Sequence, residues 1–166
     1  MTDQLNFLAG SLIDTASNAK LTVACAESCT GGWIAKAITD QAGSSAVFDC
    51  GVVTYSNRAK AQLLGVPATL IEEAGAVSRE VAEAMATGLL ERTSANLVVA
   101  TTGIAGPGGG TKQKPVGTVW IAWAKTDGNV EAVCRQYSGN RDAVREQTVA
   151  DALIGLKERC VNEEQQ

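Results

Sequence analysis

The sequence predicts an α/β protein in which helices cover both faces of a mixed β-sheet. In the first half of the chain, segments with the apolar periodicity of helices alternate with short apolar runs that are typical of buried strands. Later, two strand-like segments flank a turn formed by Asp127, Gly128 and Asn129. The alternation favours parallel strands joined through helices, and the hairpin adds antiparallel strands.

The first elements are a helix, a strand and a second helix. Apolar residues at three- and four-residue spacing predict an amphipathic helix at the start of the chain: Leu5, Leu8, Leu12, Ile13 and Ala16. Residues 21–26 form a short apolar run before a cluster of small polar residues, as in a buried strand that leads into a turn. A second helix is expected from Thr30 or Gly31, ended by the turn at residues 43–45.

The middle of the chain predicts one or two strands over residues 47–55, followed by three helices. Asn57 is a suitable N-cap for a short helix that ends at Leu64. A further short helix is expected over residues 68–74, and Ser78 is a suitable cap for a longer amphipathic helix.

The last third predicts three strands and one helix. A valine-rich strand over residues 96–102 precedes a glycine-rich loop at 103–115. Residues 116–124 and 130–137 form the antiparallel pair. Asp142 is expected to cap the final helix, and the charged tail that follows it is expected to fray.

The composition is that of a soluble globular protein. The 166 residues weigh 17.2 kDa, which fits a single domain spanning residues 1–166. With 45% hydrophobic residues and a mean hydropathy of +0.02, the chain is too apolar for a disordered protein and too evenly mixed for a membrane protein. The formal net charge of −4 argues against an extended basic face for nucleic acid.

Histidine and cysteine narrow the chemistry further. The chain has no histidine, which excludes Ser-His-Asp and Cys-His mechanisms within one chain. Its five cysteines are an odd number with no secretory leader, so we expect free thiols and a cytoplasmic location. Cys25 and Cys29 are too weak a pattern to predict a metal site.

Three loops rich in Gly, Ser and Thr follow predicted strands, and they are expected to converge because ligands bind beyond the carboxyl ends of strands in open α/β sheets. The first loop places Ser28 just before a helix whose free N–H groups could hold an oxyanion, so Ser28 is a candidate nucleophile. The alternative is that Ser28 or Thr30 only caps the helix. Cys29 competes as nucleophile, but no imidazole is present to form its thiolate.

Lys60 is the candidate base for a serine nucleophile, since a lysine with a lowered pKa can accept a proton. It is alternatively a solvated surface charge. Tyr55, at the end of the preceding strand, donates to a transition state or fills the sheet.

The glycine-rich segment 101–110 fits neither the P-loop nor the dinucleotide fingerprint, so no cofactor is indicated. It is either a backbone nest for a phosphate or carboxylate, or a flexible loop. Arg141 either clamps a phosphate or pairs with Asp142 or Glu146.

Segments at residues 26–32, 43–48, 51–60, 64–66, 75–78, 102–107 and 114–119 together resemble the CinA C-terminal domain family. The likeness runs from about the first helix to the last. It implies a three-layer α/β/α sandwich with a mixed sheet. It also implies a nicotinamide-nucleotide amidase, which hydrolyses nicotinamide mononucleotide to nicotinate mononucleotide and ammonia with a serine–lysine dyad and no metal or cofactor.

By this resemblance Ser28 is the nucleophile and Lys60 its base, with Ser45 as a second candidate nucleophile and Tyr55 beside them. The implied substrate-binding residues are Thr30, Gly31, Thr102, Gly103, Gly106 and Arg141. Glu27 or Tyr55 could stabilise the positive charge of the pyridinium ring. The expected partner is the small-molecule substrate, with no nucleic acid or membrane, and a homodimer is favoured.

One residue departs from the family pattern, because Asn140 stands where an acidic residue often precedes the arginine. This departure bears on how Arg141 is positioned. The alternative function is a non-catalytic nucleotide-binding or interaction domain, in which the same loops hold a phosphorylated ligand without chemistry.

Overall fold

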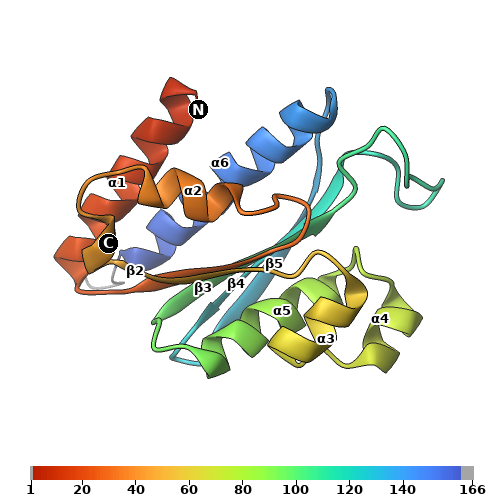
Figure 1. The fold of residues 1–166 in the computed structure, drawn as a ribbon, viewed down its shortest axis with the longest axis horizontal. Helices are drawn as coiled ribbons and strands as arrows, with labels where there is room; N and C mark the ends of the chain where they lie inside the picture. Colours follow the sequence, from red (N-terminus) through yellow and green to blue (C-terminus); the bar gives the residue numbers. More distant parts are fainter. Residues whose placement is uncertain (1, 162–166) are drawn as a thin grey trace.

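The computed structural model describes residues 2–161, which form a five-stranded sheet between two layers of helices (Figure 1). The strand order is β2-β1-β3-β4-β5. The strands are β1 (Val23–Glu27), β2 (Phe48–Val53), β3 (Leu97–Gly103), β4 (Thr118–Lys125) and β5 (Val130–Gln136). β1 pairs in parallel with β2 and β3, whereas β3, β4 and β5 pair antiparallel, which confirms the predicted mixed sheet.

Six α-helices and one 3-10 turn lie on the two faces of the sheet within the described residues. They are α1 (Asp3–Ala19), α2 (Trp33–Thr39), α3 (Asn57–Leu64), α4 (Ala68–Ala74), α5 (Arg79–Arg92), α6 (Arg141–Cys160) and η1 (Ser44–Ala46). Helices α1, α2 and α6 cover one face and α3, α4 and α5 the other, so the predicted covering of both faces is confirmed (Figure 1). The predicted fraying of the charged tail after Leu156 is wrong for residues 157–160, which continue α6 to Cys160, and residues 162–166 lie outside the described residues.

The middle of the sheet is buried on both sides. Every residue of β1 is buried, and β3 is buried from Leu97 to Thr102, as expected for strands covered by helices on both faces. The edge strand β2 alternates between half-buried and exposed residues. Two hydrophobic clusters result, one on each face, and both reach the carboxyl ends of β1 and β3.

Two helix caps differ from the prediction, and one agrees with it. The cap of α3 is Ser56, whose Oγ accepts from the Ala59 N–H at 3.0 Å, and Asn57 is already helical. The cap of α6 is Asn140 rather than Asp142, which lies in the first turn. Ser56 and Asn140 each have an extended backbone and stand directly before the first helical residue, so their short polar side chains can accept from a free N–H of the first turn. Ser78 caps α5 as predicted.

The predicted start of α2 at Thr30 or Gly31 is wrong because the backbone there is not helical. Gly31 and Gly32 have φ angles of +60° and +98°, so α2 begins at Trp33. The buried carboxylate of Glu27 accepts from the N–H groups of Ile34 at 2.9 Å and Ala35 at 3.1 Å. Glu27, at the end of β1, therefore takes the capping role that the sequence suggested for Ser28 or Thr30.

Replacing Glu27 with alanine is expected to destabilise the protein by about 3 kcal/mol, because one buried and one partly buried N–H group at the start of α2 lose their carboxylate acceptor. The measurement is the free energy of unfolding in urea. The control is Glu83→Ala, which removes a partly exposed ion pair with Arg79 at 3.5 Å and is expected to cost less than about 1 kcal/mol. Equal unfolding midpoints in the two variants would contradict the capping role.

Candidate active site

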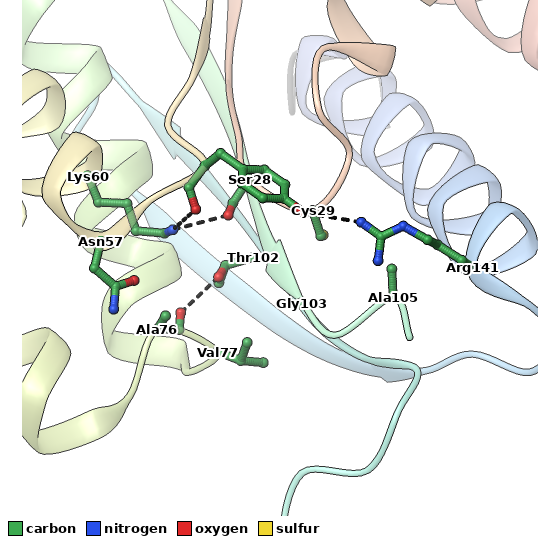
Figure 2. Close-up of a pocket in the computed structure, with 11 residues that line it drawn as sticks. Ser28, Cys29, Asn57, Lys60, Ala76, Val77, Thr102, Gly103, Ala105 and Arg141 are labelled. Carbon is green, nitrogen blue, oxygen red and sulfur yellow. Dashed lines mark hydrogen bonds between the residues drawn. The ribbon is translucent and has the colours of Figure 1, made fainter. Parts of the chain in front are cut away.

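A pocket of about 180 Å³ opens at the carboxyl ends of β1, β2 and β3. Because these strands are parallel, the segments that follow them meet at one edge of the sheet, and the predicted convergence of the loops is confirmed. Strand β4 is antiparallel to β3, and β5 is antiparallel to β4, so β5 runs in the same direction as β3. Helix α6 follows β5 and therefore starts at the same edge of the sheet. The lining residues are Ser28, Cys29, Tyr55, Asn57, Lys60, Ala76, Val77, Thr102, Gly103, Ala105 and Arg141 (Figure 2).

Ser28 and Lys60 contact each other in this pocket. The Nζ of Lys60 donates to Ser28 Oγ at 3.1 Å and to the Tyr55 carbonyl at 3.3 Å. Ser28 directly follows β1, and its N–H donates to the Thr101 carbonyl at 3.0 Å, which fixes its backbone beside β3. Lys60 and Leu64 lie one turn apart on the buried side of α3. The interpretation of Lys60 as a solvated surface charge is therefore wrong.

Burial destabilises the charged form of Lys60. Its side chain is only 1% exposed, and no carboxylate within residues 2–161 lies within ion-pair distance of Nζ. Burial lowers the pKa of Lys60 below its ordinary value of 10.5. A lysine amine in this environment, hydrogen-bonded to a hydroxyl, can accept the hydroxyl proton.

Cys29 is a poor competitor for the role of nucleophile. Its side chain is buried, and burial raises the pKa of the thiol to about 12. The thiol therefore stays protonated at neutral pH, whereas the neighbouring Ser28 hydroxyl has a base within hydrogen-bond distance.

Arg141 lies on the other side of the pocket from Lys60, with Ser28 between them (Figure 2). Its Nη1 donates to the Gly106 carbonyl at 2.7 Å, and its Nη2 donates to the Tyr55 hydroxyl at 3.1 Å. Neither of the predicted surface pairings of Arg141, with Asp142 or Glu146, forms within the described residues. The guanidinium is thus held at the mouth of the pocket by neutral groups, and its positive charge is available to an anion.

Asn140 caps the helix that begins with Arg141. Its Oδ1 accepts from the Ala143 N–H at 2.9 Å, so α6 starts at Arg141. Asparagine and aspartate are comparable N-caps, which explains why this departure from the family pattern leaves the start of the helix in place.

Thr102 and Gly103 form the floor of the pocket at the end of β3. The Thr102 hydroxyl donates to the Ala76 carbonyl at 2.8 Å, which ties β3 to the segment between α4 and α5 (Figure 2). At Gly103 a Cβ atom would come within 2.6 Å of the Val119 side chain, so only glycine fits beside β4.

Four residues of the predicted set do not line the pocket. Gly106 is buried, and its carbonyl accepts from Arg141, which does line the pocket. Thr30 is buried behind it, and its hydroxyl shares a hydrogen bond with the Thr101 hydroxyl at 2.9 Å. Gly31 lines a neighbouring cavity with Arg145. Ser45 is exposed in η1, before β2 begins, so a strand of six residues, about 20 Å long, separates it from the pocket edge. The expectation that Ser45 lines the same site as Ser28 is not met.

The sequence did not single out several lining residues. Asn57 precedes Lys60 by three positions in α3, and the helical repeat places residues at this spacing on one face, so this signal was available. Ala76 and Val77 lie in the segment 75–78 that carries part of the family resemblance, but no site role was predicted for them, and the packing of α4 and α5 brings them to the pocket. Glu27 was suggested as a partner for a pyridinium ring, but its carboxylate accepts hydrogen bonds from the N–H groups of Ile34 and Ala35 in α2.

None of the helices within residues 2–161 combines the length and apolar composition needed to cross a membrane. In the same part of the chain, no group of three or more Cys, Asp or Glu side chains is arranged to hold a metal ion.

Comparison with known proteins gives one consistent result. The model of the CinA C-terminal domain family matches residues 5–160. Nicotinamide-nucleotide amidohydrolase PncC from Enterobacter agglomerans is 56% identical over 131 residues, covering 79% of this chain and 80% of that protein. The protein of the same name from Escherichia coli strain K12 is 55% identical over 137 residues, covering 81% and 82%. The crystal structure of the competence/damage inducible protein CihA from Agrobacterium tumefaciens superposes with a TM-score of 0.91 at 47% identity, covering 94% of this chain and 97% of that one.

Proposed function

This chain belongs to the CinA C-terminal domain family, and from this premise we propose that it hydrolyses nicotinamide mononucleotide to nicotinate mononucleotide and ammonia through a Ser28–Lys60 dyad. The observation that carries the mechanism is the 3.1 Å hydrogen bond between Lys60 Nζ and Ser28 Oγ inside the pocket. The single domain, the cytoplasmic location and the homodimer expected from the sequence stay predictions.

The reaction is an acyl transfer in two steps. Neutral Lys60 takes the proton of Ser28, and Oγ attacks the carboxamide carbon of the substrate. The tetrahedral intermediate collapses when Lys60 returns this proton to the leaving nitrogen, so ammonia departs and a nicotinoyl ester remains on Ser28. Lys60 then takes a proton from water, the hydroxide attacks the ester carbon, and the proton returns to Ser28 as the carboxylic acid leaves and gives up its own proton to solvent.

The oxyanion of each tetrahedral intermediate needs hydrogen-bond donors close to Ser28. The main-chain N–H of Cys29 directly follows Ser28, belongs to a residue that lines the pocket, and donates to no main-chain acceptor within residues 2–161. This N–H is the donor that we propose for the oxyanion.

Arg141 is the proposed partner of the substrate phosphate, and replacing it with glutamine is expected to raise the KM for nicotinamide mononucleotide about 10- to 100-fold, the worth of a hydrogen bond to a charged group. Nicotinamide riboside lacks the phosphate, so its kcat/KM is expected to change by less than about threefold in the same variant. The measurement is steady-state ammonia release from both compounds. An equal loss of kcat/KM for both compounds would mean that Arg141 acts on the amide end of the substrate and not on its phosphate.

The decisive test of the proposed function is ammonia release from nicotinamide mononucleotide by the purified protein in excess chelator, with nicotinate mononucleotide identified as product. Release that survives the chelator is the expected result. If the folded protein is stabilised by the mononucleotide but leaves it intact over hours, the site belongs to a non-catalytic nucleotide-binding domain.

A further inference from the structure

Arg145 lies outside the pocket, yet it contacts the backbone of the pocket wall. Its Nε donates to the Cys29 carbonyl at 3.1 Å and its Nη2 donates to the Thr30 carbonyl at 3.1 Å. The guanidinium also lies over the Trp33 ring, 5.4 Å from its centre. The proposed mechanism makes no use of this residue.

These bonds add to the other supports of the turn between Ser28 and α2. The carbonyls of Ser28, Thr30 and Gly32 accept from the main-chain N–H groups of Gly31, Trp33 and Lys36, and the Thr30 hydroxyl shares a hydrogen bond with that of Thr101. Gly31 and Gly32 both have left-handed backbone angles, so this turn relies on residues with the greatest conformational freedom. Arg145 is therefore the residue of α6 that donates hydrogen bonds to this turn, one to the Cys29 carbonyl and one to the Thr30 carbonyl.

The contact also determines where one peptide group points. In a trans peptide the C=O and N–H lie on opposite sides, so holding the Cys29 carbonyl toward Arg145 aims the Thr30 N–H away from it. Arg145 lines the neighbouring cavity with Trp33 and Lys36, whereas Cys29 lines the pocket of Ser28 and Lys60.

The charges around Arg145 do not offer it a stronger partner. Asp142 is 3.9 Å away, but its side chain is 84% exposed and the pair is screened by water. Lys36, the other cation of the cavity, pairs with Asp40. A planar guanidinium, which offers several N–H donors in fixed directions, suits two neighbouring carbonyl groups better than a lysine ammonium does.

We propose that Arg145 is a positioning residue for the amide hydrolysis: by holding the carbonyls of Cys29 and Thr30, it fixes the turn that follows Ser28 and keeps the Ser28 hydroxyl within hydrogen-bond distance of Lys60. This inference rests on the proposed function. Small displacements of reacting groups cost on the order of 100-fold in rate, so the effect belongs to kcat.

The test compares Arg145→Gln, Arg145→Lys and the matched control Arg159→Gln. Arg159 lies on the same helix, 4.2 Å from the centre of the Trp123 ring, and donates to the Gly155 carbonyl at 3.0 Å, far from the pocket. Arg145→Gln is expected to lower kcat about 100-fold with KM within threefold. Arg145→Lys is expected to rescue little, and Arg159→Gln to keep the wild-type kcat with a melting temperature no higher than that of Arg145→Gln.

Three kinetic results would overturn the proposal: an equal loss of kcat in Arg159→Gln, a raised KM with unchanged kcat in Arg145→Gln, or full rescue by Arg145→Lys, which would show that charge alone matters.

A second experiment separates this proposal from the proposed function. It measures acylation of Ser28 by p-nitrophenyl acetate through the mass of the intact protein, because this ester needs no nucleotide site. If the wild type is acylated but releases no ammonia, the proposed function fails, and Arg145 is then judged by acylation, which its glutamine variant is expected to slow about 100-fold. Unchanged acylation in that variant, or a wild type inert to both compounds, overturns the role of Arg145.

Discussion

Replacing Ser28 with alanine is expected to lower kcat for nicotinamide mononucleotide by at least about 10⁴-fold, because no acyl-enzyme can form without Oγ. Alanine keeps the backbone bond from residue 28 to the Thr101 carbonyl and removes only the atom that Lys60 contacts. The fold and the affinity for substrate are therefore expected to survive. Ammonia release gives kcat, and isothermal titration with the uncleaved mononucleotide gives the affinity of the variant.

Two further alanine variants serve as controls for this prediction. Ser45→Ala is expected to stay within about twofold of wild type, because Ser45 is exposed at the opposite end of β2. Cys29→Ala is expected to keep more activity than Ser28→Ala, because the Cys29 thiol stays protonated. An active Ser28→Ala protein beside an inactive variant of Ser45 or Cys29 would assign the nucleophile to that other residue.

The arrangement of Ser28, Lys60 and Thr102 at one edge of the sheet could be predicted from the sequence. Ser28 follows a segment with the pattern of a buried strand, and Thr102 ends another such segment. Lys60 lies on the inward side of the helix that follows a third strand segment. Because parallel strands end at the same edge, the local pattern was enough to bring together residues up to about 70 positions apart in the chain.

The roles of Glu27, Arg145 and Ser45 could not be predicted in the same way. Glu27 ends a strand and faces the start of α2, a contact that depends on where two glycines place the helix. Arg145 reaches the turn after Ser28 only through the packing of α6 on the sheet. A motif that resembles a family does not tell at which end of a strand each residue lies, so Ser45 was expected in a site from which β2 separates it.

Replacing Lys60 with methionine is expected to lower kcat/KM at least about 10³-fold and to remove its dependence on pH in the range where the lysine titrates. A general base must be unprotonated, so for wild type log kcat/KM is expected to rise by about one per pH unit below the lowered pKa of Lys60 and to level off above it. Lys60→Arg keeps a cation but cannot deprotonate, so it is expected to be as inactive as the methionine variant. Arginine that restores activity would show that Lys60 acts by its charge and not as a base.

The Lys60→Met variant is also expected to be more stable than wild type at neutral pH. The pKa of Lys60 is lower in the folded protein than its ordinary value of 10.5, so between these two values the unfolded chain binds more protons than the folded one. The free energy of unfolding of wild type therefore rises with pH across this window, and that of Lys60→Met lacks this rise. Urea unfolding of both proteins at a series of pH values measures the difference, which is expected to be largest below the window and to shrink toward pH 10.5. A difference that grows with pH would mean that Lys60 is held as a stabilised cation, and a base with that property could not activate Ser28 near neutral pH.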